Sequence, residues 1–419
     1  MSKRADLINR IIAVVIILFL CVVFAQRTLR HHMGFINSIR NSISNFIQSD
    51  EGFSGRMYDF YMDLHKGVKG NVEWNYSYPP RENDFNQLHY EYLRATGRGY
   101  FNGVALLTDG RVVMHTLEPE LFFNERTDSI TTFANYFKNK DIPFLYVRLP
   151  NKVQDNSVMA IPFADSRVIE NGDMLTEMVS NNGVDTFDVR AAMNRDNINF
   201  EAGFYRYHLH WTNNTVLWAS QRLGEIMNRD YGFNIDLSVW DLERYNQLVY
   251  RNVLYGSEAY HVGRFHRLED VTFLIPDFPV NLEKADNNHG FQAEFSYDFM
   301  EIFLPDIYHG LNERFVCHNI RLPGAHFTYI TNHAASEDKR VLMLSDSFSL
   351  SWVMYLPLGF KNLEFVYLIN QRTLHEIWDF IDGKEYDLVI LAVSDVIVSG
   401  DTAKEFADDR INFGTPPVR

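Results

Sequence analysis

Two short segments, far apart in the sequence, hold the residues that could do chemistry. The later one, Leu344–Ser349, follows an apolar run typical of a buried strand and opens a run typical of a helix. Ser347 lies at that junction, where the free N–H groups of a helix start stabilise the negative charge of an acyl-transfer oxyanion. The earlier segment, Tyr207–Trp211, contains His210, an imidazole that could accept the serine proton. These residue types suggest a serine-nucleophile enzyme of the esterase or acetyltransferase kind.

Each of these residues also has a purely structural interpretation. Ser347 and its polar neighbours could simply cap the following helix, as such residues commonly do. If Ser347 is a nucleophile, we expect the backbone N–H groups of Ser347 and Phe348 to bind the oxyanion. His208 lies two residues before His210 and shares its face if the segment is extended. The two histidines could bind a metal, but no third ligand lies nearby in the sequence, so we predict no metal site.

Composition limits the classes of function. The 419-residue chain is 46% hydrophobic and 22% charged, which is ordinary for a globular protein with a substantial core. A net charge of −15 argues against nucleic acid as a partner. Neither Cys21 nor Cys317 belongs to a Cys-x-x-Cys pattern, so the sequence indicates no zinc or redox site, and it points to no cofactor.

An uncharged apolar run at residues 11–25 follows three basic residues. It is shorter than the roughly 20 residues of a straight membrane-spanning helix, although Leu7 and Ile8 could lengthen it. A cleavable signal peptide is the alternative. We interpret the run as an uncleaved signal anchor with residues 1–10 in the cytoplasm and the rest outside. Both interpretations export the main domain.

Residues 26–84 are expected to link the anchor to that domain. Isoleucines and Phe46 repeat at helical spacing after the anchor, which predicts an amphipathic stalk helix. The same face could instead pack on the main domain. A polar stretch with Pro79-Pro80 then reads as a linker.

From residue 85 onward strand and helix patterns alternate, which predicts an α/β domain with a mostly parallel sheet. Asp109-Gly110 predicts a hairpin, and residues 230–339 read as an irregular, aromatic insertion. Strands are expected at 144–149, 184–189, 341–344, 363–368 and 388–393. Helices are expected at 129–140, 172–181, 213–227, 348–356 and 374–381.

Several short motifs, taken in their order and spacing, resemble the SGNH hydrolase-like proteins of the DHHW and alginate O-acetylation (AlgJ/AlgX-like) kind. In that group an Asp-x-His-Trp motif precedes a Gly-Asp-Ser-Phe-like motif by a hundred or more residues. The resemblance covers most of the chain from about residue 85. Besides the two segments above, it rests on Asn102-Gly103-Val104, Asp109-Gly110, Arg148-Leu149-Pro150, Val253 to Ser257, Val262-Gly263 and Tyr386 to Ile390.

The resemblance implies a three-layer SGNH-like domain and assigns roles to the candidate residues. Ser347 matches the family's nucleophile and His210 its base. The family's orienting aspartate falls on His208, and its glycine before Asp-Ser falls on Ser345. Loss of that aspartate can cost about 10⁴ in turnover. Glu201 or Asp395 could supply a carboxylate from elsewhere in the fold.

The resemblance further implies an exported enzyme that moves or removes acetyl esters on a cell-surface polysaccharide, through Ser347 and His210. A membrane-bound O-acyltransferase would be its acetyl donor. The alternative is a catalytically weakened relative that binds glycan or scaffolds an acetylation and export complex, which the His208 substitution favours. A metal-using or structural surface protein is the third hypothesis. In the leading one the protein is held in the cell membrane by one helix, with its main domain outside.

Overall fold

The computed structural model describes residues 100–101, 104–114, 123–153, 167–254, 256–258, 268–287, 290–303, 327–368, 371–395, 411 and 413. All of them belong to the second of two units into which the chain divides, Asn86–Arg419. The predicted anchor at 11–25, the stalk and linker at 26–84, and both cysteines lie outside the described residues. Within those residues, no helix combines the length and the apolar character that crossing a membrane requires.

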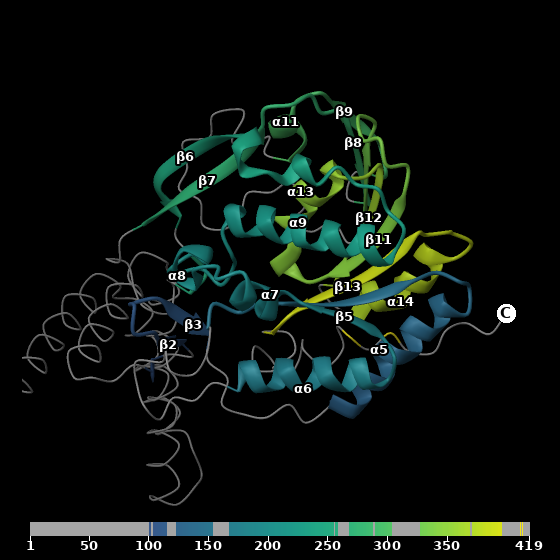
Figure 1. Cartoon of the computed structure of the whole chain (residues 1–419), viewed down its shortest axis with the longest axis horizontal. Helices are drawn as coiled ribbons and strands as arrows, with labels where there is room; N and C mark the ends of the chain where they lie inside the picture. The colour runs from purple at the N-terminus through teal and green to yellow at the C-terminus, as the bar shows by residue number, and fades with distance from the viewer. Residues whose placement is uncertain are drawn as a thin grey trace, which may run out of the picture. The chain divides into compact units, whose positions relative to one another are not determined.

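A central eight-stranded sheet organises the described residues (Figure 1). Five neighbouring strands run parallel, in the order β5-β4-β13-β11-β12. They are β4 (Phe144–Leu149), β5 (Asp185–Asp188), β11 (Arg340–Ser345), β12 (Asn362–Tyr367) and β13 (Leu388–Ser394). The predicted α/β class with a large central sheet is confirmed. Its inner parallel strands β4, β11 and β13 are mostly apolar, buried runs because both faces of the sheet are covered there.

Two hydrophobic clusters cover the two faces, as the alternation along β13 demonstrates. Leu388, Ile390 and Ala392 belong to one cluster, whereas Val389 and Leu391 belong to the other. The first face is covered by α7 (Val189–Arg195), α9 (Asn213–Asp230) and α13 (Trp352–Tyr355). The second is covered by α5 (Phe123–Lys138), α6 (Val168–Asn181) and α14 (Gln371–Ile381). Helix layers therefore enclose the sheet (Figure 1).

The region expected to be an irregular insertion at 230–339 contributes to this sheet, so that expectation is wrong. Strands β8 (Leu282–Asp286), β9 (Glu294–Ser296) and β10 (Phe327–Asn332) continue the sheet beyond β12 by antiparallel pairing. The pattern of β8 misleads because its inward positions include Lys284 and Asp286. Both side chains are buried, and they form an ion pair at 3.4 Å.

Smaller elements complete the described part of the chain. The predicted hairpin at Asp109-Gly110 is confirmed, since it joins β2 to β3, and Gly110 has a positive φ of 83°. A separate antiparallel pair, β6 and β7, precedes β8. The remaining bounds are β1 (Tyr100–Phe101), β2 (Val104–Leu106), β3 (Val112–Met114), β6 (Tyr245–Leu254), β7 (Glu269–Pro276), α8 (Phe200–Gly203), α11 (Phe299–Phe303), η2 (Leu237–Trp240) and η3 (Leu242–Arg244).

The helix predicted at 348–356 is broken into three short pieces. They are η5 (Ser347–Ser349), α13 and η6 (Leu356–Leu358). The Asp346 side chain accepts the Phe348 N–H at 2.7 Å and so caps the first of these pieces, η5. Pro357 has no N–H to continue the helix at its other end. No long helix therefore begins in the described residues directly after β11, and the charge stabilisation expected at Ser347 from the start of such a helix is reduced.

Candidate active site

The two histidines lie on a closed loop between α8 and α9. Phe204 and Trp211 pair as an isolated antiparallel bridge, and the Thr212 N–H donates to the Gly203 carbonyl at 2.9 Å. His208 is fully buried and His210 is 5% exposed. The loop therefore presents its histidines to the interior of the domain.

A buried lysine and a half-buried glutamate hold the backbone of this loop from two sides. Lys152, which follows β4, donates to the Tyr205 carbonyl at 3.1 Å. Glu269, at the start of β7, accepts from the N–H groups of Arg206 at 2.5 Å and Tyr207 at 2.8 Å. Burial raises the pKa of the Glu269 carboxyl, and these two N–H donors oppose that shift. These bonds fix the backbone of the loop at Tyr205, Arg206 and Tyr207.

A third support is the turn at residues 256–258. The Glu258 N–H donates to the Tyr207 carbonyl at 3.0 Å, and the Glu258 carboxylate forms a buried ion pair with Lys152. Burial lowers the pKa of Lys152, while the charge of Glu258 raises it. Gly256 lies against the loop so closely that a Cβ there would be 2.0 Å from the Tyr207 carbonyl oxygen.

The structure brings the predicted residues His208, His210 and Ser347 together in one chain of contacts. His208 Nε2 lies 3.0 Å from His210 Nδ1, and the two rings are 4.6 Å apart. His210 Nε2 lies 3.0 Å from the backbone carbonyl oxygen of Ser347. On its other side His208 Nδ1 is 2.9 Å from Ser257 Oγ and accepts from the Ser257 N–H at 3.1 Å. His208 therefore holds His210 from the side that an orienting aspartate would occupy.

Ser347 is half-buried at the carboxyl end of β11, where ligands of parallel sheets bind. His210 contacts its carbonyl and not its hydroxyl. The residue before it, Asp346, is buried, and its second carboxylate oxygen accepts from both the N–H and the hydroxyl of Ser394 at 2.8 Å. Through these bonds, Asp346 attaches the turn that contains Ser347 to the adjacent strand β13.

The expected oxyanion donors need one correction. The Phe348 N–H donates to Asp346 Oδ1 at 2.7 Å, so it is already engaged. The Ser347 N–H remains as the candidate. Ser345, at the family's glycine position, is fully buried and donates to the Ala392 carbonyl on β13 at 2.5 Å. A serine is accommodated there because the neighbouring strand accepts its hydroxyl.

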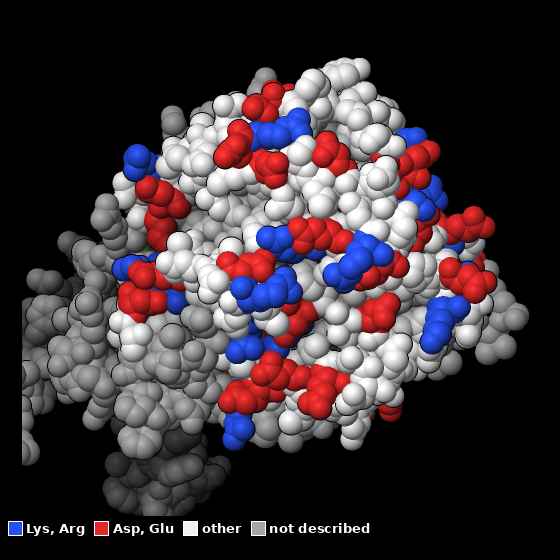
Figure 2. Space-filling model, viewed as in Figure 1, with Lys and Arg blue, Asp and Glu red and all other residues white. Residues whose placement is uncertain are grey.

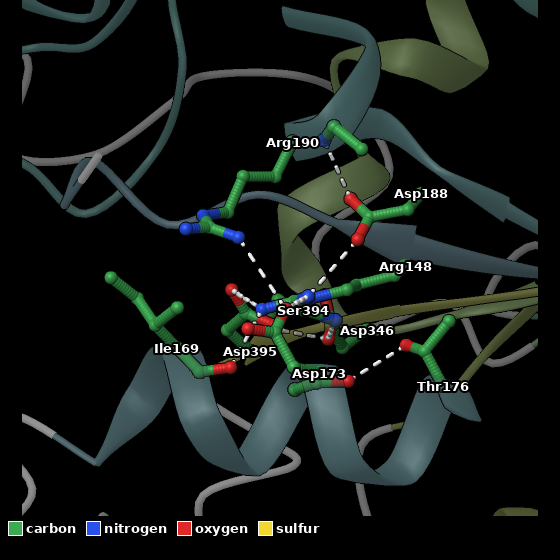
Figure 3. A network of polar contacts seen from close by, with 11 residues as sticks. Arg148, Ile169, Asp173, Thr176, Asp188, Arg190, Asp346, Ser394 and Asp395 are labelled. Carbon is green, nitrogen blue, oxygen red and sulfur yellow. Dashed lines mark hydrogen bonds and ion pairs between the residues drawn. The ribbon is translucent and has the colours of Figure 1, made fainter. Parts of the chain in front are cut away.

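Neither carboxylate suggested as a substitute for the missing aspartate serves the histidines. The Glu201 side chain is 56% exposed and lies 3.8 Å from the Arg206 guanidinium. Asp395 is buried at the end of β13 and is bound by Arg148 at 2.7 Å (Figure 3). Both suggestions are therefore wrong, because these carboxylates are committed to arginines.

Figure 3 shows the network around Arg148, a fully buried guanidinium at the end of β4. Arg148 also donates to Asp188 at 3.0 Å and to the Ile169 carbonyl at 3.0 Å, and it pairs with Asp173. Burial raises the pKa of Asp395 to about 6, although the charge of Arg148 pulls it down. The network ties the carboxyl ends of three parallel strands together beside Asp346 and Ser394.

A metal site has little support in the described part of the chain. No group of three or more His, Cys, Asp or Glu residues that could hold a metal occurs among those residues. The ring nitrogens of His208 and His210 instead contact each other, Ser257 and Ser347.

Comparison with solved structures places this arrangement among known folds. The structure of Bacillus cereus PatB1 with a sulfonyl adduct is similar at a TM-score of 0.58 and 15% identity, over 74% of this chain and 98% of that one. The chain shares the fold of PatB1. Comparisons with protein-family models and with curated proteins give no match.

Two further solved structures are similar at lower TM-scores. A DHHW family protein from Eubacterium siraeum has a TM-score of 0.48 at 12% identity, over 75% of this chain and 96% of that one. The O-acetyltransferase domain of Pseudomonas putida AlgJ has a TM-score of 0.43 at 12% identity, over 72% and 94%. Proteins of the predicted DHHW and AlgJ kinds are thus among the similar structures.

Sequence reasoning missed the residues that hold the histidine loop. Ser257 belongs to a segment that carried the resemblance, but no role followed from it. Lys152, Glu258 and Glu269 carried no signal, because single charged residues in a sequence are most often on the surface. In the fold, Lys152 and Glu258 are distinguished by their burial, and Glu269 by its two bonds to the loop backbone.

Proposed function

We propose that this protein is an exported serine acyl-transfer enzyme that moves or removes acetyl groups of a cell-surface polysaccharide. The observation that carries the proposal is the contact chain from Ser257 through His208 and His210 to Ser347. A nucleophile, a base and a third group that orients the base are what nucleophilic catalysis of acyl transfer requires. The assignment of an acetyl group and of a polysaccharide as substrates comes from the motif resemblance.

In the proposed reaction Ser347 Oγ attacks the carbonyl carbon of an acetyl ester and gives its proton to His210 Nε2. The bond from the carbonyl carbon to the leaving oxygen then breaks, and His210 returns the proton to that oxygen. The product is acetyl-Ser347. A sugar hydroxyl, or water, attacks this intermediate, gives its proton to His210, and Ser347 recovers its proton as it leaves.

The proximity of the two residues supports this reaction. His210 Nε2 lies 3.0 Å from the backbone carbonyl oxygen of Ser347, and the reaction requires the ring to bond the Ser347 hydroxyl instead. Hydrogen bonds between catalytic groups are often formed only when substrate binds. Export and membrane attachment belong to the proposal through residues 11–25, and a membrane-bound O-acyltransferase is its proposed acetyl donor.

The second candidate is a weakened relative that binds glycan or scaffolds an acetylation complex. It is favoured by His208, which stands at the position of the orienting aspartate. A neutral imidazole cannot stabilise the imidazolium of the base as a carboxylate does, and loss of the carboxylate can cost about 10⁴ in turnover.

Ester turnover by the full-length protein separates the two. We expect slow hydrolysis of p-nitrophenyl acetate that Ser347→Ala and His210→Ala abolish, and that His208→Asp raises by at least about tenfold. Ser351→Ala is the matched control, because Ser351 is a nearby buried serine whose hydroxyl has no hydrogen-bond partner in the described structure. Turnover that survives Ser347→Ala would refute the enzyme proposal. Activity in His208→Asp alone would favour the weakened relative.

A further inference from the structure

The two-histidine chain ends in backbone groups whose hydrogen-bonding roles are fixed. At one end the Ser257 N–H, which can only donate, lies 3.1 Å from His208 Nδ1. At the other end the Ser347 carbonyl, which can only accept, lies 3.0 Å from His210 Nε2. Because a neutral imidazole carries one N–H, these two groups determine where the protons are.

The assignment can be followed from either end. The Ser347 carbonyl requires a proton on His210 Nε2, so His210 Nδ1 is an acceptor. His208 Nε2, 3.0 Å away, must then be the donor to it. That leaves His208 Nδ1 as an acceptor, which is what the Ser257 N–H requires. Both ends thus give the same answer, with each ring protonated at Nε2.

This arrangement is opposite to the one that general-base catalysis needs. A carboxylate at position 208 would only accept, so it would place the proton of His210 on Nδ1 and leave Nε2 free for the serine proton. Here His210 Nε2 is protonated in the resting state. A base that already carries a proton at the reacting nitrogen cannot take another there.

We infer that the site rests in this reversed form and that Ser257 is the positioning residue that lets it convert to the catalytic one. The inference rests on the proposed function for its catalytic part. In the converted form both rings carry their proton on Nδ1. His208 Nδ1–H then needs an acceptor, and Ser257 Oγ, 2.9 Å away, is a hydroxyl that can accept as well as donate.

The conversion from the reversed to the catalytic form moves protons only between the two rings and water, and their total number is unchanged. The proton on His208 Nε2 moves to His210 Nδ1. Water gives a proton to His208 Nδ1, and His210 Nε2 gives its proton to water. No charge is created overall, and His210 Nε2 becomes free to accept the proton of Ser347 Oγ. The Ser257 N–H loses its acceptor in this form, which is why the reversed form is favoured at rest.

The direction of the chain has a spectroscopic test that does not depend on activity. The ¹⁵N signals of histidine rings in the full-length protein are assigned at about pH 8, where an ordinary histidine is neutral. We expect both His208 and His210 to be protonated at Nε2, and His210 to change to Nδ1 protonation in His208→Asp. A proton on His210 Nδ1 in the unsubstituted protein would overturn the inference.

The role of Ser257 is tested by a double-mutant cycle on the rate of p-nitrophenyl acetate turnover. We expect Ser257→Ala to lower kcat about tenfold, Ser257→Thr to restore it because the hydroxyl is kept, and KM to change little. In a His208→Ala background the same Ser257→Ala change should have less than about a twofold effect. Equal losses in both backgrounds would overturn a role exerted through His208.

The two tests distinguish failure of this inference from failure of the proposed function. If no variant turns over the ester, the proposed function fails, while the ring assignment can still be read from the spectra. If Ser347-dependent turnover is observed with His210 protonated at Nδ1, the proposed function stands and the reversed chain is refuted.

Discussion

At the residue scale, the replacement of an aspartate by His208 changes the direction of a hydrogen-bonded chain and not its connectivity. His208 still contacts His210 Nδ1 at 3.0 Å, and Ser257 anchors it from behind. What is lost is the negative charge, because neither Glu201 nor Asp395 reaches the histidines. The site therefore keeps its geometry while its electrostatic support is reduced.

The loop that carries the histidines depends on Glu269, which leads to a prediction. Glu269→Gln keeps the shape but replaces one acceptor oxygen by an NH₂ group facing a backbone N–H. We expect a loss of about 1 kcal/mol in the free energy of unfolding, because a backbone N–H of the loop loses its charged acceptor. Urea denaturation measures it. Glu201→Gln is the matched control, since its side chain is 56% exposed and its effect should stay within about 0.5 kcal/mol. Equal losses in the two variants would contradict this account of the loop.

At the element scale, the site is assembled where several chain segments end together. β11 supplies Ser347 at its carboxyl end, the loop before α9 supplies the histidines, and the turn after β6 supplies Ser257. That turn approaches the histidine loop backbone to backbone at Gly256, where a Cβ would lie 2.6 Å from the His208 nitrogen. Only a glycine permits this approach.

Gly256→Ala should therefore separate the turn from the histidine loop. We expect a destabilisation of about 1–3 kcal/mol and at least a tenfold loss of Ser347-dependent turnover, since the atoms in the way are backbone atoms. Gly183→Ala is the control. Gly183 has a φ of 77° and no atom within 4 Å of an added Cβ, so it should lower stability by backbone strain and leave turnover per folded molecule unchanged. Unchanged turnover in Gly256→Ala would contradict the proposed contact.

The strands were easier to predict from the sequence than the site, because a buried strand leaves an apolar run in the sequence and a contact between distant residues does not. The strand predicted at 144–149 agrees with β4, and those at 341–344 and 388–393 differ from β11 and β13 by one or two residues, because buried parallel strands are continuous apolar runs. The single helix predicted at 348–356 is three short helical pieces in the structure. Ser257 could not be predicted, because its contact with His208 spans 49 residues and depends on the tertiary fold.

At the scale of the whole molecule, the largest sheet of the described residues has two covered faces, and the ion pair of the buried Arg148 and Asp395 joins two strands at its carboxyl edge. Acidic and basic side chains interleave over the described part of the face in Figure 2, consistent with the net charge of −15. Arg148 differs from these surface charges because it is buried among its acidic partners (Figure 3). It couples three strands next to the turn that carries Ser347.

That network predicts how stability depends on pH. Asp395 has a pKa of about 6 in the folded protein, above its ordinary value of 3.8, because burial disfavours the charged form more than Arg148 favours it. The folded state therefore binds this proton more tightly than the unfolded state. The corresponding stabilisation is present below pH 3.8 and is lost as the pH rises through 6.

Asp395→Asn removes this dependence. Between about pH 4 and pH 7 the free energy of unfolding of the unsubstituted protein should fall by about 2 kcal/mol relative to that of Asp395→Asn. Urea denaturation of both proteins across that range measures the difference. Parallel curves would contradict the raised pKa, and a difference of opposite sign would mean that Arg148 outweighs burial.

The central claim is that Ser347 carries an acetyl group during the reaction, and peptide mass spectrometry tests it most directly. The full-length protein is mixed with p-nitrophenyl acetate, quenched in acid within seconds and digested, and the peptide with Ser347 is weighed. The account predicts a gain of one acetyl group on Ser347 that is absent in His210→Ala and larger in His208→Asp. An acetyl group found only on other residues, or none on Ser347 even in His208→Asp, would contradict it.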